Sequence, residues 1–265
     1  MKKLTFFAVV IAAMAFSACG NKSAQNTEGA DTIKSFEQEQ VEQKIKIELD
    51  SLAAEVGKLK SLPIVQSDNG IELTAEEKQV KPDFLLAPAV IEEATTLAEK
   101  YRILSALSVD KKIAALYEMP TEEYDAAISK LAADINDPSF KVVDDASSIF
   151  ETGQKLYDAM NENGRINYFW QLMASSLVEE TYVISQNTEK FITAFDDDAA
   201  ANVTFRIVLL SDAIARLAQY DPEVEPVAKA VEALAPLNAI SVDQLKTQLE
   251  EAKENIAEAR AQLLK

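Results

Sequence analysis

Glycine is scarce in this chain, which has only six glycines in 265 residues. All-β folds place glycine at many of their tight turns and fill their strands with β-branched residues. This sequence is instead rich in alanine, leucine, glutamate and lysine, which have high helix propensity. It therefore predicts an all-α fold.

Apolar residues recur at spacings of three and four along most of the chain, as on the buried face of a helix. The stripes are narrow, with a coiled-coil rhythm, in a first helix expected over residues 31–60 and in a last helix that starts at Val242. Their members are Ile45, Leu49, Leu52, Val56 and Leu59, and then Val242, Leu245, Leu249, Ala252, Ile256, Ala259 and Leu263. We expect an irregular helical bundle in which the first and last helices pair.

A long helix over residues 165–195 carries the only tryptophan and several other aromatic side chains. We expect it to be the central helix of the bundle. A preceding helix contains Gly153, which costs about 1 kcal/mol relative to alanine in a helix interior. The sequence therefore predicts that another helix approaches closely at this glycine.

Residues 62–87 interrupt the helical pattern. Two short apolar runs flank Asn69-Gly70, a pair typical of hairpin turns, so we expect a short β-hairpin, followed by a helical turn capped by Thr74. Residues 81–88 then form an extended apolar connector that includes Phe84 and Leu85. Loops of this length in compact domains are often functional, although sealing one end of the bundle is an alternative role.

The chain begins with Lys2 and Lys3, an apolar run from Phe6 to Phe16, and small residues before Cys19. The run is too short to span a bilayer, and the whole pattern is typical of a secretion signal. The segment Phe16-Ser17-Ala18-Cys19 resembles a bacterial lipobox. The resemblance implies a signal peptide over residues 1–18 that is removed, and acyl chains on Cys19.

The polar, aperiodic residues that follow Cys19 read as a flexible tether, so the expected organisation is signal peptide 1–18, tether 19–30 and helical domain 31–265. The lipoprotein resemblance, with Gly20 rather than aspartate after the cysteine, implies the outer membrane. The first acidic residue after the cysteine is Glu28, which favours the periplasmic face. A formal net charge of −18 argues against nucleic acid as a partner.

The chain contains no histidine and a single cysteine. Without them, most hydrolytic triads, disulfide frameworks and common zinc sites are excluded. Adjacent acidic pairs are frequent, but helix neighbours point about 100° apart and do not flank one substrate bond. Glu179 and Glu180 are the exception of interest, because one of them is expected to face inward on the central helix. No cofactor, metal or catalytic residue is predicted.

Three functional hypotheses remain at this point. The first is a membrane-tethered, non-catalytic lipoprotein that binds or scaffolds another envelope protein. The second is a ligand-binding domain with a pocket between residues 165–195 and 62–87. The third, an enzyme that uses carboxylates alone, requires two inward acids in one cleft. The candidate ligand or partner contacts are Phe84, Leu85, Tyr168, Trp170, Glu179 and Glu180.

Overall fold

The computed structural model describes residues 36–66, 70–142 and 152–264. The predicted signal peptide, Cys19 and the tether lie outside these residues. Within them the chain forms helices and no β-strand, which confirms the all-α fold. The α-helices are α1 (Phe36–Val56), α2 (Ala75–Gln79), α3 (Leu97–Leu116), α4 (Glu122–Ile135), α5 (Gly153–Glu162), α6 (Ile166–Gln186), α7 (Thr188–Phe191), α8 (Asp197–Leu217), α9 (Glu225–Ala233), α10 (Val242–Glu251) and α11 (Lys253–Leu263).

Short 3-10 segments join several of these helices. They are η1 (Pro63–Val65), η2 (Pro88–Glu92), η3 (Pro138–Val142), η4 (Ile192–Ala194) and η5 (Pro222–Val224). Four of them begin at a proline, which suits a first helical position because its fixed φ fits and its missing N–H would have no partner there.

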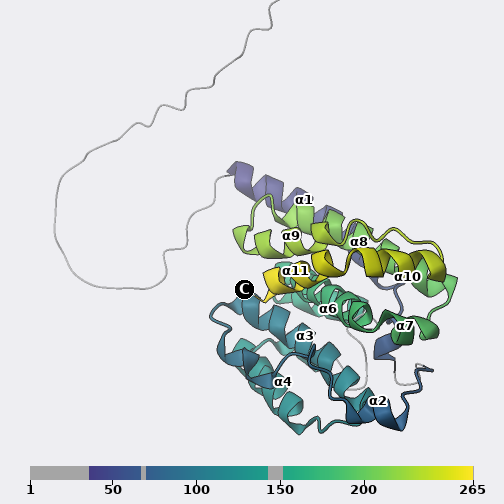
Figure 1. Cartoon of the computed structure of the whole chain (residues 1–265). Helices are drawn as coiled ribbons and strands as arrows, with labels where there is room; N and C mark the ends of the chain where they lie inside the picture. Colours follow the sequence, from purple (N-terminus) through teal and green to yellow (C-terminus); the bar gives the residue numbers. More distant parts are fainter. Residues whose placement is uncertain (1–35, 67–69, 143–151, 265) are drawn as a thin grey trace, which may run out of the picture.

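Helix α6 is the centre of the molecule, as the sequence predicts. It packs against α3 on one side and against α11, α8 and α9 on the other (Figure 1). Every residue from Phe169 to Thr181 is buried, which is the pattern of a helix surrounded by others. The observed helix α6 is shorter than the predicted range of 165–195. The backbone leaves helical geometry at Asn187 (φ −142°, ψ 63°) before α7 begins.

The pairing predicted between the first and last helices is wrong. Helix α1 packs against α8 and α5, whereas α11 packs against α9 and α6. The last helix is also divided at Ala252, between α10 and α11. The narrow apolar stripes are buried as expected, except that Leu52 and Val242 are half-buried. They meet other helices, because a stripe of leucine and alanine fits many apolar surfaces equally well.

The close approach predicted at Gly153 is confirmed. A Cβ atom built on this glycine would lie 2.6 Å from Cγ1 of Val56. Gly153 is the first residue of α5, and Val56 is the last residue of α1. The missing side chain therefore lets the end of α1 lie directly against the start of α5.

The hairpin predicted within residues 62–87 is also wrong. Residues 63–65 form the 3-10 segment η1, whose Ile64 and Val65 are buried, and η1 packs against α3 and α6. The apolar residues of this run are therefore buried against helices and do not alternate across a strand pair. Gly70 does have the positive φ (68°) expected of a turn residue.

Candidate functional site

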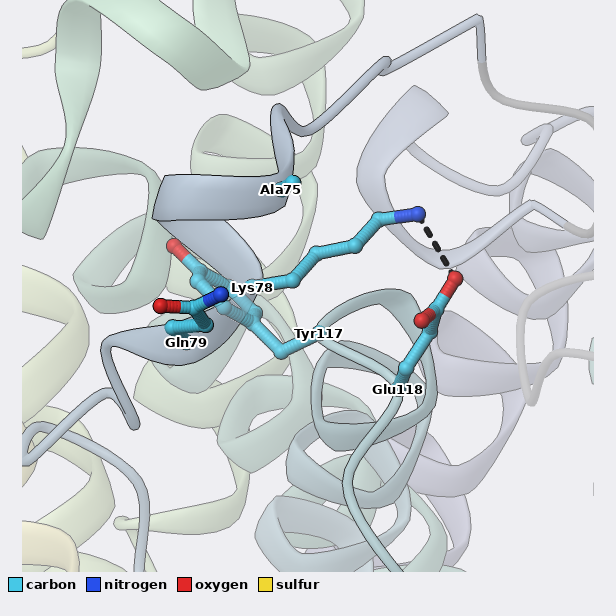
Figure 2. A pocket seen from close by; sticks show the side chains of 5 residues that line it. All are labelled: Ala75, Lys78, Gln79, Tyr117 and Glu118. Atoms are coloured by element: carbon cyan, nitrogen blue, oxygen red, sulfur yellow. Dashed lines mark hydrogen bonds and ion pairs between the residues drawn. The ribbon is translucent and has the colours of Figure 1, made fainter.

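A surface pocket of about 440 Å³ lies between α2 and the C-terminal end of α3 (Figure 2). The two elements that line the pocket are distant from each other in sequence. Its lining residues are Ala75, Lys78 and Gln79 of α2 and Tyr117 and Glu118 after α3. The pocket thus offers an ammonium, a carboxylate, an amide and an aromatic ring.

Helix α2 begins with the capping box that the sequence predicts at Thr74. Thr74 Oγ1 accepts a hydrogen bond from the Glu77 N–H at 3.2 Å, and Glu77 Oε2 accepts one from the Thr74 N–H at 2.6 Å. This reciprocal pair satisfies amides that a helix start otherwise leaves without a partner. The Glu77 carboxylate also pairs with Lys190 of α7 at 2.8 Å, and the Lys190 hydrogen bond lowers the pKa of Glu77. The pocket wall is therefore tied to the bundle.

The opposite wall contains a residue in left-handed backbone geometry. Glu118 has φ 55°, and its N–H and that of Met119 reach back to the carbonyl oxygens of Ala115 and Ala114, both at 2.9 Å. This is the helix ending at which glycine is usually found, and left-handed geometry costs other residues about 1–2 kcal/mol. The Glu118 carboxylate then bridges the pocket to Lys78 Nζ at 2.6 Å.

The connector of residues 81–88 is held against the core next to this pocket. The Leu86 N–H donates to Asp110 Oδ2 of α3 at 2.7 Å, and the Leu86 carbonyl oxygen accepts from the Tyr124 hydroxyl of α4 at 2.9 Å. Phe84 meets the Tyr117 ring edge-on, with ring centroids 6.5 Å apart. The candidate contacts Phe84 and Leu85 are half-buried packing residues, and Phe84 supports the pocket through Tyr117.

Trp170 lies elsewhere. It is fully buried and packs edge-on against Phe169 and Tyr157, with centroids 5.1 and 6.0 Å away. The pocket described above contains no α6 residue, so it lies at a different place from the pocket predicted between residues 165–195 and 62–87. Trp170 is a core residue.

Tyr168 is half-buried and stacks on the ring of Tyr101 at 4.8 Å with an interplanar angle of 8°. The Tyr101 hydroxyl donates to the buried Asp137 carboxylate at 2.5 Å. Burial and this carboxylate raise the pKa of Tyr101. One face of Tyr168 is therefore occupied by a partner from α3.

Glu179 and Glu180 are both buried, and they point to different helices, as expected for neighbours. Glu179 binds Arg260 of α11 through both oxygens at 2.8 and 2.6 Å. Glu180 pairs with Arg206 of α8 at 3.1 Å. Burial raises the pKa of Glu180 and lowers the pKa of Arg206 to about 10, because each loses solvation for its charged form.

The buried charged residues around these acids were not predicted from the sequence. Arg206, Arg260 and Asp110 each lie within an otherwise apolar helical stripe; Arg206, for example, falls between Val203 and Leu210. A charged residue on a buried face requires a partner of opposite charge. A charged residue inside an apolar stripe of the sequence therefore indicates a buried ion pair. The acids are locked in ion pairs inside the bundle and do not line the pocket, so the arrangement does not place two carboxylates in one cleft.

Comparison with known proteins gives no match: no family model, curated protein or solved structure is similar to this chain. Over the described ranges, no cluster of three or more His, Cys, Asp or Glu side chains is arranged to hold a metal ion. In the same ranges, no helix is both long and apolar enough to cross a membrane.

Proposed function

We propose that this protein is a lipid-anchored, non-catalytic binding module of the bacterial envelope, and that its partner contacts the pocket between α2 and the end of α3. Acyl chains on Cys19 tether it to the outer membrane at the periplasmic face. Each buried acyl CH₂ contributes about 0.8 kcal/mol, so two or three chains hold a domain without a spanning helix.

The observation that carries the proposal is the contrast between the interior charges and the pocket charges. The interior acids Glu179 and Glu180 are enclosed and bound to arginines. In the pocket, the Lys78 and Glu118 side chains remain 33 % and 69 % exposed. Exposed ion pairs contribute under about 1 kcal/mol. A partner with complementary charges therefore replaces this bridge at little cost.

The pocket is suited to a polar, charged segment of a protein partner. Tyr117 is one of its lining residues, and tyrosine contributes strongly to interfaces because its apolar ring carries a polar end. Gln79 adds an amide that donates and accepts hydrogen bonds. The net charge of −18 argues against nucleic acid or an anionic lipid surface as the partner.

An affinity pull-down from solubilised envelopes tests the pocket. The bait proteins are the native chain, Lys78→Glu, and the matched control Lys229→Glu, which reverses an exposed lysine paired with Glu225 on α9. We expect a discrete partner with the native and Lys229→Glu baits and its loss with Lys78→Glu. Equal recovery with Lys78→Glu contradicts a role for the pocket.

The anchor is tested separately by growing cells with labelled palmitate. We expect label on the native chain and none on Cys19→Ser, with the Cys19→Ser form moving out of the membrane fraction. Label that persists on Cys19→Ser contradicts lipidation at this residue.

The pocket volume of about 440 Å³ favours a second candidate, a small-ligand-binding domain, because ligand pockets typically measure about 300–1,000 Å³. Native mass spectrometry of the purified protein separates the two. A small molecule that co-purifies with the native chain and is lost with Lys78→Glu, without a protein partner, favours the second candidate.

A further inference from the structure

Asp110 of α3, Glu179 of α6 and Arg260 of α11 form a buried group with two carboxyls and one cation. Their side chains are 0 %, 2 % and 13 % exposed. Arg260 uses its Nε and Nη2 atoms on Glu179, at 2.8 and 2.6 Å. Asp110 Oδ2 lies farther away, 3.6 Å from Arg260 Nη2. If both carboxyls were ionised, the group would bury one uncompensated negative charge.

The two oxygens of Asp110 have unequal surroundings. Oδ2 accepts the Leu86 N–H at 2.7 Å, whereas Oδ1 is fully buried and has no hydrogen-bond donor among the described residues. A buried acceptor without a donor is costly, and for a charged oxygen the cost is greater. A proton on Oδ1 changes that oxygen from an acceptor without a partner into a donor.

Among the described residues, Asp110 has one ion-pair partner, Arg260. From α4, the Tyr124 hydroxyl donates to the Leu86 carbonyl oxygen. On α3 itself, Lys111 pairs with Asp125, and Lys112 donates to the Val65 carbonyl oxygen at 3.1 Å. Burial and the negative charge of Glu179 together raise the pKa of Asp110.

We propose that Asp110 and Glu179 share one proton in the folded protein, carried on Asp110 Oδ1 and donated to Glu179, and that this proton keeps the connector closed over α3. The proton comes from solvent and returns to it, so the step is a simple protonation of the Asp110 carboxylate. Glu179, bound to Arg260 through both oxygens, keeps its negative charge.

The connector is the element that responds, because Leu86 lies directly on Asp110 Oδ2. When the proton leaves, two carboxylates face one guanidinium in a dry site, and water must enter to solvate the added charge. Water reaches Asp110 by displacing Leu86. Movement of Leu86 also moves Phe84, which supports the Tyr117 ring of the pocket.

Infrared spectroscopy of the full chain tests the shared proton. We expect a C=O stretching band of a protonated carboxyl at neutral pH, reduced in Asp110→Asn, whose amide mimics the protonated acid. Glu180→Gln is the matched control, because Glu180 is the neighbouring buried acid and binds Arg206 instead. We expect the infrared band of the protonated Asp110 carboxyl to persist in this variant. Absence of the band in the native chain, or an unchanged band in Asp110→Asn, overturns the proposal.

Hydrogen exchange tests the connector. As pH rises, we expect the amide of Leu86 in the native chain to lose protection relative to an unstructured peptide, by up to about tenfold per pH unit for one released proton. Asp110→Asn retains its protection. If Asp110→Asn does not fold, the native chain alone tests the proposal. In the native chain, the infrared band and the protection of the Leu86 amide must be lost over the same pH range. Loss of the band without loss of protection overturns the connector's role.

Discussion

The ion pair between Glu180 and Arg206 gives the sharpest stability prediction. The two side chains are 1 % and 0 % exposed and 3.1 Å apart. At an effective dielectric constant of about 20, unit charges at this separation attract by about 5 kcal/mol. Removing one partner of a buried pair typically costs about 3–5 kcal/mol, because the other charge remains without compensation. We expect Arg206→Met to lower the free energy of unfolding by about this amount at neutral pH.

The loss should depend on pH in a defined direction. Burial raises the pKa of Glu180 even with Arg206 present, and removal of the cation raises it further. A carboxyl whose pKa is raised on folding stabilises the protein at low pH, and this stability is lost as pH rises through the folded-state pKa. The deficit of Arg206→Met should therefore be smallest near or below the unfolded glutamate pKa of about 4.3 and grow toward neutral pH.

Urea denaturation followed by circular dichroism, at pH 5 and pH 8, measures both effects. Arg206 Nε also donates to Asn202 at 2.7 Å, so part of the loss is independent of Glu180. The double variant Glu180→Gln/Arg206→Met separates the two contributions in a double-mutant cycle. A loss below about 1 kcal/mol, or the same loss in the Glu180→Gln background, would refute the reasoning.

Three further predictions use the same denaturation assay. Gly153→Ala should cost about 1–3 kcal/mol, because its Cβ would lie 2.6 Å from Val56 Cγ1; the cost should shrink in a Val56→Ala background, and an unchanged cost contradicts the close contact. Glu118→Gly should be more stable than Glu118→Ala by about 1 kcal/mol, since both lose the Lys78 bridge and only glycine relieves the φ of 55°; equal stabilities contradict the strain. Thr96→Ala should cost about 1 kcal/mol, because Thr96 accepts the Glu99 N–H at the start of α3; Thr121→Ala, at an N-cap without such a bond, is the control, and equal losses contradict the capping role.

Features that depend on neighbouring residues could be read from the sequence. Asp196 and Ser241 cap α8 and α10 as their residue types predict, and Gly164 has the positive φ (67°) expected after α5. These features follow from hydrogen bonds within one helical turn. One of Glu179 and Glu180 was expected to face inward, and the structure buries both, because helices surround α6 at this point.

Features that depend on distant segments were not predictable in the same way. The pocket was missed because its two walls, α2 and the end of α3, are about forty residues apart in sequence, as the Lys78–Glu118 ion pair shows. Patterns within a short stretch of sequence do not predict that two distant segments contact each other.

The sequence by itself determined that this chain is helical and which residues form apolar faces. The tertiary structure decided which faces meet: α1 lies against α8 and α5 rather than α11. It also decided which charges are paired, since the apolar stripes that hold Asp110, Arg206 and Arg260 come together only in the folded bundle. The physical reason is that apolar contact is non-directional. A stripe specifies that a face is buried, and only the packing of all helices together specifies the partner.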